Sequence, residues 1–228
     1  MSTRKIGLIG GMSWKSTAVY YQLLNEITQQ RFGEFRSATT LLYSVDFAEI
    51  VQLQRAGAWH EAGQLLADAA RRLEAAGAEM IMIGAVTMHK VADAVQQAVG
   101  IPLLHIADVT AAAIKTCGLT KVGLLGTKYT MEDAFFHDKL KQHGIETIVP
   151  AQADRDEVHR VIFEELTKGT INQSSKQAYI TIIERLRALG AEGIVLGCTE
   201  IPMLIGSAES PLPVFDTTYL HVVAALNA

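Results

Sequence analysis

Cys198 is the residue whose type and surroundings point most clearly to chemistry. It ends an apolar run in the segment Gly197-Cys198-Thr199-Glu200, and Pro202 follows it closely. An apolar run that breaks into small and polar residues is typical of a buried strand that leads through a turn into a helix. The N-terminus of a helix stabilises a thiolate and lowers the pKa of the thiol. We therefore predict that Cys198 is a functional thiol, although buried, inert cysteines are common.

The segment around Cys198 is the second copy of a repeated pattern. Residues 185–197 repeat residues 72–84 at an offset of 113 positions, and Ala85 stands where the second copy has Cys198. Residues 5–10 and 121–126 form a further matching pair, at an offset of 116. The two offsets differ by a three-residue change in loop length. The repeat predicts two similar halves, of which the first lacks the thiol.

Short apolar runs alternate with longer stretches of helical periodicity, such as residues 60–76 and 175–189. The runs are continuous rather than alternating, as expected for strands whose sheet is covered on both faces. Alternating strands and helices indicate parallel sheets with right-handed crossovers. The sequence thus predicts an α/β fold with two pseudo-symmetric lobes, each an open, mainly parallel sheet flanked by helices. The predicted strands are 5–10, 39–45, 78–85, 103–106, 121–126, 146–150, 192–197 and 213–215.

The repeat also predicts the domain boundaries. The first lobe should contain residues 1–104, joined by the C-terminal residues 213–228, and the second should contain residues 105–212. Ligands of open parallel sheets lie beyond the carboxyl ends of the strands. Because Gly10, Ala85, Gly126 and Cys198 follow such ends, we expect both lobes to face one cleft.

Composition excludes several classes of protein. The hydrophobic content of 49% supports sizeable cores, and a net charge of -4 without a basic cluster argues against nucleic-acid or anionic-membrane surfaces. No apolar stretch approaches the roughly 20 residues that span a bilayer, and the first residues lack the pattern of a signal peptide. Cys117 and Cys198 do not form a disulfide framework. The histidines lack metal-ligand spacing, so we expect a cytoplasmic protein without a metal.

Polar residues in the strand-to-helix turns are candidate ligand-binding groups. Their hydroxyl and backbone groups could hold a carboxylate, and the alternative for each threonine is helix capping. The glycines of these turns fit neither the dinucleotide fingerprint nor the P-loop. Gln54, Arg55 and Lys168 could reach a ligand from the rim, although a solvated arginine or a lysine at a helix end is the ordinary case. The candidates in the turns are Ser13, Thr17, Thr87, Thr127, Tyr129, Thr130 and Thr199.

At these residues the chain resembles the aspartate/glutamate racemase family over nearly its whole length. The supporting segments are residues 6–14, 44–47, 87–90, 124–131, 197–200 and 213–218. The resemblance implies two pseudo-symmetric α/β lobes, a homodimer, an amino-acid or dicarboxylate substrate, and catalysis without a cofactor, including pyridoxal phosphate. It also implies that two thiols on opposite faces of the substrate's α-carbon act alternately as base and acid.

The chain departs from the family at the centre of that mechanism. Where the family usually has Cys-Asn-Thr, this chain has Ala85-Val86-Thr87. Alanine cannot transfer a proton, and Val86 removes an amide expected to bind the substrate. Cys198 and three threonines match the family's pattern. The catalytic positions are therefore Cys198 and Ala85, and the substrate-binding positions that we assign are Met12, Gln54, Val86, Thr87, Thr127, Thr130, Thr199 and Lys168.

Three functions fit these residues. We favour an isomerase, namely a racemase acting on aspartate, glutamate or a related amino acid. We expect its activity to be impaired or one-sided, because only water or a mobile side chain could replace a thiol at Ala85. A decarboxylase that resembles the arylmalonate decarboxylases would need only Cys198, to protonate the carbanion left by the loss of CO₂. A non-catalytic carboxylate-binding protein is the third alternative, and Val86 favours it.

Overall fold

The computed structural model describes residues 4–228, which form two compact units. The first unit contains the chain up to His105 together with His221–Ala228, and the second contains Ile106–Leu220. Each unit is an α/β layer structure built on its own parallel sheet. No helix within the described residues is long and apolar enough to cross a membrane.

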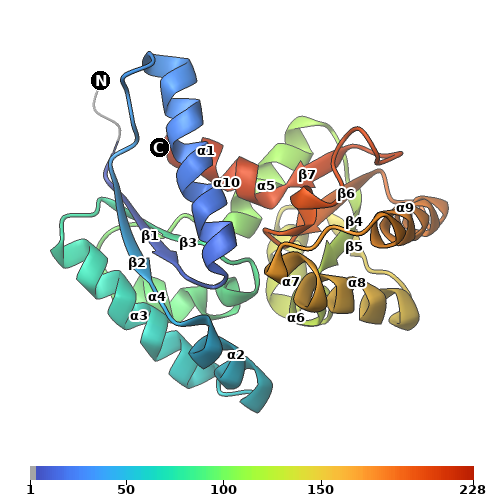
Figure 1. Ribbon diagram of the computed structural model, residues 1–228, viewed down its shortest axis with the longest axis horizontal. Coiled ribbons are helices and arrows are strands. Elements are labelled where there is room, and N and C mark those ends of the chain that lie inside the picture. Colours follow the sequence, from blue (N-terminus) through green and yellow to red (C-terminus); the bar gives the residue numbers. More distant parts are fainter. Residues whose placement is uncertain (1–3) are drawn as a thin grey trace. The chain divides into compact units, whose positions relative to one another are not determined.

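The sheet of the first unit has the strand order β2-β1-β3, and both pairs are parallel (Figure 1). Its strands are β1 (Ile6–Gly10), β2 (Thr40–Ser44) and β3 (Met80–Ile83). β1 and β3 are buried along their whole length, as their continuous apolar runs predict. β2 is partly exposed because it lies at the edge of the sheet.

Successive side chains of β1 and β3 point to opposite faces of the sheet, so both faces are apolar. Helices cover both faces. Ile9, Ile81 and Ile83 pack on one side against an apolar cluster that includes α3. Leu8 and Met82 pack on the other side against residues of α1 and α10. The helical elements of this unit are α1 (Trp14–Phe32), α2 (Phe47–Ala56), α3 (Trp59–Ala75), the 3₁₀ helix η1 (Thr87–Val91) and α4 (Ala92–Gln97).

The second unit repeats this plan with one strand more. Its sheet has the order β5-β4-β6-β7, so β4, β5 and β6 correspond to β1, β2 and β3. The strands are β4 (Lys121–Gly126), β5 (Glu146–Ile148), β6 (Gly193–Gly197) and β7 (Val214–Asp216). All three pairs are parallel. Two open parallel sheets of matching order confirm the predicted fold class.

Apolar side chains of α8 and α9 join those of β4 and β6 in one buried cluster, which also contains Cys198. This cluster therefore links the helices of the second unit to the end of β6. The helical elements are α5 (Ile106–Thr116), α6 (Lys128–Glu132), α7 (Ala134–Gln142), α8 (Gln152–Glu164), η2 (Leu166–Lys168), α9 (Gln173–Ala188), η3 (Ile201–Met203) and α10 (Thr217–Ala225), the last of which runs on into the first unit.

Two sequence-based predictions were wrong. Residues 103–106 form no strand: Leu103 makes one isolated bridge with Ile81, and α5 begins at Ile106. Residues 213–228 do not all return to the first unit, because β7 pairs with the free edge of β6 and the Thr217 hydroxyl donates to the carbonyl oxygen of Leu196 (2.8 Å). Of this C-terminal segment, only residues 221–228 belong to the first unit.

Candidate active site

In the first unit, the turns that follow β1 and β3 lie side by side. The two strands are neighbours, and the Gly84 N–H donates to the carbonyl oxygen of Ile9 (2.8 Å). Gly11 has a φ of +90°, and a Cβ on it would lie 2.2 Å from the carbonyl oxygen of Val45. A glycine is therefore required where the chain turns from β1 into α1. Met12, the next residue, is buried.

Thr17 holds the turn after β1 in place. Its hydroxyl accepts a hydrogen bond from the Gly11 N–H (2.8 Å) and donates one to the carbonyl oxygen of Ser13 (3.1 Å). The Ser13 hydroxyl is buried and has no hydrogen-bond partner within residues 4–228. Ser13 and Thr17 were both predicted as candidate ligand-binding residues. The hydrogen bonds of Thr17 give it a structural role in the turn.

Residues 84–87, which we call the Ala85 turn, follow β3. Ala85, Val86 and Thr87 are each less than a tenth exposed. One turn further on, His89 Nδ1 lies 3.0 Å from the carbonyl oxygen of Ala85 and donates to it. Burial and the neighbouring His105 and His221 hold the pKa of His89 well below its ordinary value, so its ring is neutral. The side chain at position 85 is a methyl group, which cannot move a proton.

Gln54 and Arg55 lie near the end of α2 and differ in their surroundings. Gln54 is buried, and its Nε2 donates to Sδ of Met88, the residue that follows Thr87 (3.2 Å). Arg55 is exposed. The structure therefore brings Gln54 next to the 3₁₀ helix that begins at Thr87, and it leaves Arg55 at the surface.

In the second unit, residues 197–200 form the Cys198 turn directly beyond β6. Cys198 Sγ donates to Glu200 Oε2 across 3.1 Å, and the Thr199 hydroxyl donates to the same oxygen across 2.8 Å. All three residues are buried. Burial and, after it, the negative charge of Glu200 raise the pKa of the Cys198 thiol well above its ordinary value. Cys198 is consequently a protonated thiol at neutral pH.

The expected lowering of this pKa by a helix N-terminus was wrong. Only the short 3₁₀ helix η3 follows Cys198, with Pro202 in its first turn. Backbone hydrogen bonds from Glu200 and Ile201 lower the pKa, but burial and the carboxylate outweigh them. Glu200 itself is a candidate functional residue that the sequence analysis did not assign. The available signal was a glutamate two positions after a cysteine in an apolar context, because glutamates are rarely buried without a partner.

The turn after β4 lies next to the Cys198 turn. Gly126 and Gly197 are partners in the register of β4 and β6. A Cβ on Gly126 would lie 2.8 Å from the carbonyl oxygen of Gly197, so glycine permits this close approach. Thr127 caps α6 by accepting from the Thr130 N–H (3.3 Å), and the two hydroxyls are also 3.3 Å apart. Both threonines are buried, whereas the neighbouring Tyr129 is half-buried.

The other predicted ligand, Lys168, lies in η2 beyond α8 and is exposed. Its amine has no hydrogen-bond or ion-pair partner in the described part of the chain, residues 4–228. Cys117, just beyond α5, is exposed and free, in contrast to the buried Cys198.

A comparison with family models decides the family. The model described as Asp/Glu/Hydantoin racemase matches residues 9–225. The chain belongs to this family. Membership makes it an isomerase of the racemase class, and it agrees with the two parallel sheets described above.

Several members and relatives of the racemase family are similar over most of the chain. A Yersinia pestis protein provisionally assigned as an Asp/Glu racemase is 50% identical, with a TM-score of 0.92, and the match covers 99% of this chain and 98% of that protein. An aspartate racemase homologue from Pyrococcus horikoshii OT3 is 36% identical, with a TM-score of 0.87 and the same coverage of 99% and 98%. The broad-specificity amino-acid racemase RacX of Bacillus subtilis (strain 168) is 24% identical over 216 residues, which cover 93% of this chain and 92% of RacX.

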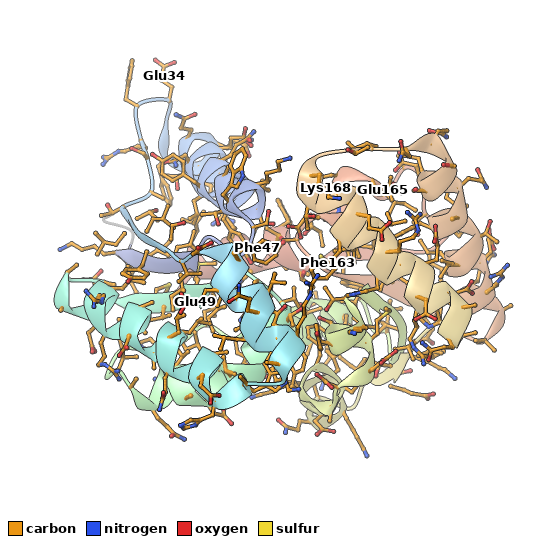
Figure 2. The ribbon with its side chains drawn as sticks, turned by 60° about the horizontal axis from the view of Figure 1, so that its bottom comes forward. Glu34, Phe47, Glu49, Phe163, Glu165 and Lys168 are labelled. Carbon is orange, nitrogen blue, oxygen red and sulfur yellow. The ribbon has the colours of Figure 1, made fainter. Side chains whose placement is uncertain are left out.

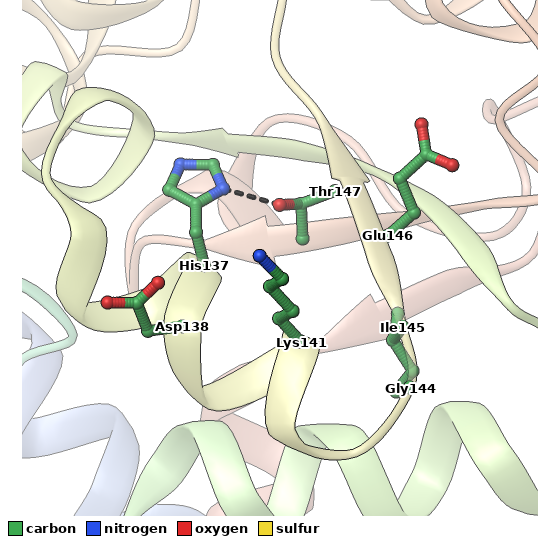
Figure 3. A pocket seen from close by; sticks show the side chains of 7 residues that line it. All are labelled: His137, Asp138, Lys141, Gly144, Ile145, Glu146 and Thr147. Carbon is green, nitrogen blue, oxygen red and sulfur yellow. Dashed lines mark hydrogen bonds between the residues drawn. The ribbon is translucent and has the colours of Figure 1, made fainter.

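A surface cavity of the second unit contains none of the predicted racemase residues (Figure 3). Thr147 belongs to β5, and Gly144 and Ile145 precede that strand. The cavity thus lies at the amino end of β5, whereas Thr127 and Cys198 follow the carboxyl ends of their strands. The remaining lining residues are His137, Asp138, Lys141 and Glu146. Within residues 4–228, no three His, Cys, Asp or Glu side chains are placed to hold a metal ion.

Proposed function

We propose that the protein is a cofactor-independent amino-acid racemase that acts on aspartate, glutamate or a related amino acid, with Cys198 as the acid–base thiol. The observation that carries this proposal is the buried Cys198–Glu200 hydrogen bond in the turn beyond β6. Family membership supports the reaction class, and the names of RacX and of the Pyrococcus homologue support an amino-acid substrate. Independence of pyridoxal phosphate is part of the proposal.

Proton transfer at the α-carbon explains why such a site needs both a thiol and hydrogen-bond donors. Removal of the α-proton builds negative charge on the adjacent carboxylate, and preorganised donors around that carboxylate stabilise the carbanion. We assign this task to the hydroxyl and backbone groups of Thr87, Thr127 and Thr130, with Thr199, Met12 and Gln54 as further contacts.

The protonation state of Cys198 defines its role. As a thiol, it can donate its proton to a carbanion. To act as a base, it must first give that proton away, and Glu200 Oε2 already accepts it in a hydrogen bond. Glu200 therefore serves as the proton acceptor that converts the thiol into a thiolate. A well-placed acid–base group contributes ~10²–10⁴-fold to a rate.

The methyl group of Ala85 makes the proposed reaction one-sided. Cys198 should exchange the α-proton of one enantiomer with solvent faster than the protein inverts that enantiomer. Incubation of each enantiomer in heavy water, followed by NMR for exchange and chiral chromatography for inversion, tests this directly. Equal rates of exchange and inversion would contradict one-sidedness, and no exchange by wild-type protein would contradict the racemase proposal.

The protonated state of Cys198 also favours a second candidate, a decarboxylase of the arylmalonate type. In that reaction the bond to one carboxylate breaks, CO₂ leaves, the electron pair stays on the α-carbon, and the Cys198 thiol proton neutralises it. A base at position 85 is not needed. Release of CO₂ from an arylmalonate, lost in Cys198→Ala, would support this function over racemisation.

The third alternative is a non-catalytic carboxylate-binding protein. Val86 favours it because valine lacks the amide expected to bind the substrate. The Cys198→Ala variant separates it from an enzyme: wild-type and variant proteins that bind a carboxylate equally and both lack turnover would support a binder.

We also propose a cytoplasmic homodimer. The homodimer follows from the family resemblance, and the two free cysteines fit a reducing compartment. Sedimentation velocity measures the assembly state.

A further inference from the structure

β2 exposes one edge of the sheet in the first unit. It is the outer strand of the order β2-β1-β3, so only β1 pairs with it within residues 4–228. The Ile6 N–H donates to the carbonyl oxygen of Thr39 (2.9 Å), and the Val45 N–H donates to that of Gly10 (3.0 Å). Along a strand, alternate residues direct their backbone groups to the same neighbouring strand. The backbone groups that face away from β1 are therefore those of Thr40, Leu42 and Ser44.

This edge lacks the features that commonly keep exposed strands from pairing with other chains. Those features include lysine or proline on the edge and a β-bulge that twists the edge away. β2 has the sequence Thr-Leu-Leu-Tyr-Ser, which contains no charge and no proline. Its register with β1 is continuous from Thr40 to Ser44, so no bulge interrupts it. The edge is therefore open to pairing with another strand.

Exposed apolar side chains lie beside this edge. Leu42 is 50% exposed, and its register with β1 places it on the face of the sheet that α1 covers. On α1, the Asn25 side chain accepts a hydrogen bond from the Ala38 N–H (3.1 Å), just before β2. Tyr21 lies one turn before Asn25 on the same face of α1 and is 57% exposed. Phe35, in the loop between α1 and β2, is 93% exposed. These side chains extend the apolar surface beside the edge.

β2 is complementary to a second copy of itself. A two-fold axis through Leu42 would pair two β2 strands antiparallel. Leu41 would then lie opposite Tyr43, so that apolar residues face each other. The hydroxyl residues Thr40 and Ser44 would likewise lie opposite each other. The backbone also fits, because the residues whose N–H and C=O groups face outward would occupy the hydrogen-bonded pairs of the antiparallel ladder. One patch would serve both copies, as in most dimers.

Charges at the two ends of β2 are complementary in the same arrangement. Arg36 is exposed before the strand. Beyond the other end lies a surface hollow of about 290 Å³, whose charged lining residues are Asp46, Glu49, Asp68 and Arg72. The axis would place position 36 of one copy opposite position 48 of the other, between Asp46 and Glu49, because both positions lie six residues from it. A cation of one copy thus meets the more negative surface of the other.

The loop before β2 keeps a like charge out of this contact. Figure 2 shows Glu34 in that loop and Phe47 and Glu49 at the start of α2, at opposite ends of the segment that contains β2. The Arg36 N–H donates to the carbonyl oxygen of Gly33 (2.9 Å), so the chain turns between these two residues. Glu34 therefore leaves the line of β2 and does not oppose Glu49 in the antiparallel arrangement.

We propose that β2 forms the dimer interface: two copies of the chain pair their β2 strands antiparallel about Leu42 and join two three-stranded sheets into one. This inference rests on the proposed homodimer and assigns its surface. A stable interface buries roughly 1,600 Å² in total, and a pair of five-residue strands is too small to do so alone. Tyr21 and Phe35 supply the additional apolar contact.

Two variants of the full-length protein remove the pairing by different means. Leu42→Lys places like charges opposite each other at the axis. Thr40→Pro removes an N–H that faces away from β1, at the first residue of an edge strand, where proline is tolerated. Leu189→Lys is the matched control, because Leu189 is an exposed leucine of the second unit. Circular dichroism and the Tm check the fold of each variant.

Sedimentation velocity over a range of concentrations gives the dimer Kd of each protein. Leu42→Lys and Thr40→Pro should each raise this Kd about 100-fold or more, whereas Leu189→Lys should leave it within about twofold. Arg36→Glu should raise it about threefold, as expected for the loss of an exposed ion pair.

Introduced cysteines test the register of the two strands, in a Cys117→Ser background that removes the exposed thiol. Opposite residues of a hydrogen-bonded antiparallel pair have Cα atoms about 5.5 Å apart, which a disulfide can span. Leu42→Cys should therefore form a disulfide-linked dimer on mild oxidation, seen on a non-reducing gel. Thr40→Cys is the control, because the axis separates the two copies of position 40 by four residues, or about 13 Å.

Three results would overturn the inference. Dimers that persist in both Leu42→Lys and Thr40→Pro would place the interface elsewhere and leave the proposed homodimer intact. Equal cross-linking by Thr40→Cys and Leu42→Cys would contradict the register about Leu42. Wild-type protein that stays monomeric at every concentration would contradict the homodimer itself and leave the edge of β2 to a different polypeptide.

Discussion

Cys198 Sγ and Glu200 Oε2 are joined by a hydrogen bond of 3.1 Å in the buried turn beyond β6. The carboxylate stabilises the thiol form, because a thiolate beside it would place two negative charges in an apolar site. Thr199 donates to the same oxygen and fixes its position. The protonation state of Cys198 is thus coupled to Glu200.

Removal of the Glu200 charge should lower the pKa of Cys198. In Glu200→Gln the Coulombic repulsion disappears, so the thiolate forms at lower pH than in the wild type. Alkylation rates by iodoacetamide as a function of pH measure this, in a Cys117→Ser background that removes the exposed thiol. The same variant should exchange the substrate α-proton about 10²-fold more slowly, because glutamine cannot accept the thiol proton. An unchanged thiol pKa would show that the pair is not coupled.

Restoration of a thiol in the first unit should make proton transfer two-sided. Ala85→Cys combined with Val86→Asn reproduces the family's usual motif at two buried positions. We expect inversion to approach the rate of exchange, with a gain in inversion of ~10²–10⁴-fold from the added acid–base group. Ala85→Ser with Val86→Asn is the control, since a hydroxyl is a far weaker acid at neutral pH. Exchange measured by NMR and inversion measured by chiral chromatography give the ratio, and an unchanged ratio would argue against Ala85 as the missing partner.

Acid should destabilise the first unit through its buried histidines. The neutral ring of His221 accepts from the Tyr20 hydroxyl at Nδ1 (3.0 Å), and its Nε2 donates to the carbonyl oxygen of Leu104 (2.9 Å). Burial lowers the pKa of His221 to about 4. Between pH 6.5 and about 4 the unfolded chain binds a proton that the folded chain does not, so stability falls as pH falls. The loss from His221 is about 3 kcal/mol.

Urea unfolding at a series of pH values measures this dependence. His221→Gln should flatten the curve between pH 6.5 and 4, although the variant is less stable at neutral pH. His60→Gln, at an exposed position, should leave the slope unchanged. A wild-type stability that rises on acidification through this range would contradict the assignment.

A methyl group on Gly197 should disturb the Cys198 turn. Its Cβ would lie 2.9 Å from the carbonyl oxygen of Leu125, inside the β4–β6 pairing. Gly197→Ala should cost about 1–3 kcal/mol of unfolding free energy, as overpacking typically does, and should reduce proton exchange by displacing the thiol. Gly118→Ala is a weaker comparison, since its φ of +71° carries strain although no atom lies within 4 Å of the new Cβ. Chemical denaturation and the heavy-water assay measure both effects.

The local patterns of the chain determined its elements and the place of the thiol. The apolar runs at β1, β4 and β6 are buried strands, and the helical spacing of residues 60–76 matches α3 within one residue at each end. These predictions succeeded because burial on both faces of a sheet and helical periodicity each produce a pattern in consecutive residues. The matching strand orders also follow from the repeat that pairs Ala85 with Cys198.

Tertiary structure decided what depends on partners distant in sequence. Two similar short apolar runs had different outcomes. β7 pairs with a free sheet edge along several residues and is a strand, whereas Leu103 makes only an isolated bridge. The pKa of Cys198 rises rather than falls, since burial and the carboxylate of Glu200 outweigh a short 3₁₀ helix. The buried carboxylate of Glu165 accepts a hydrogen bond from the hydroxyl of Ser175, which lies on another helix. The sequence by itself thus determined which residue carries the thiol, and only packing and charge in three dimensions decided its protonation state.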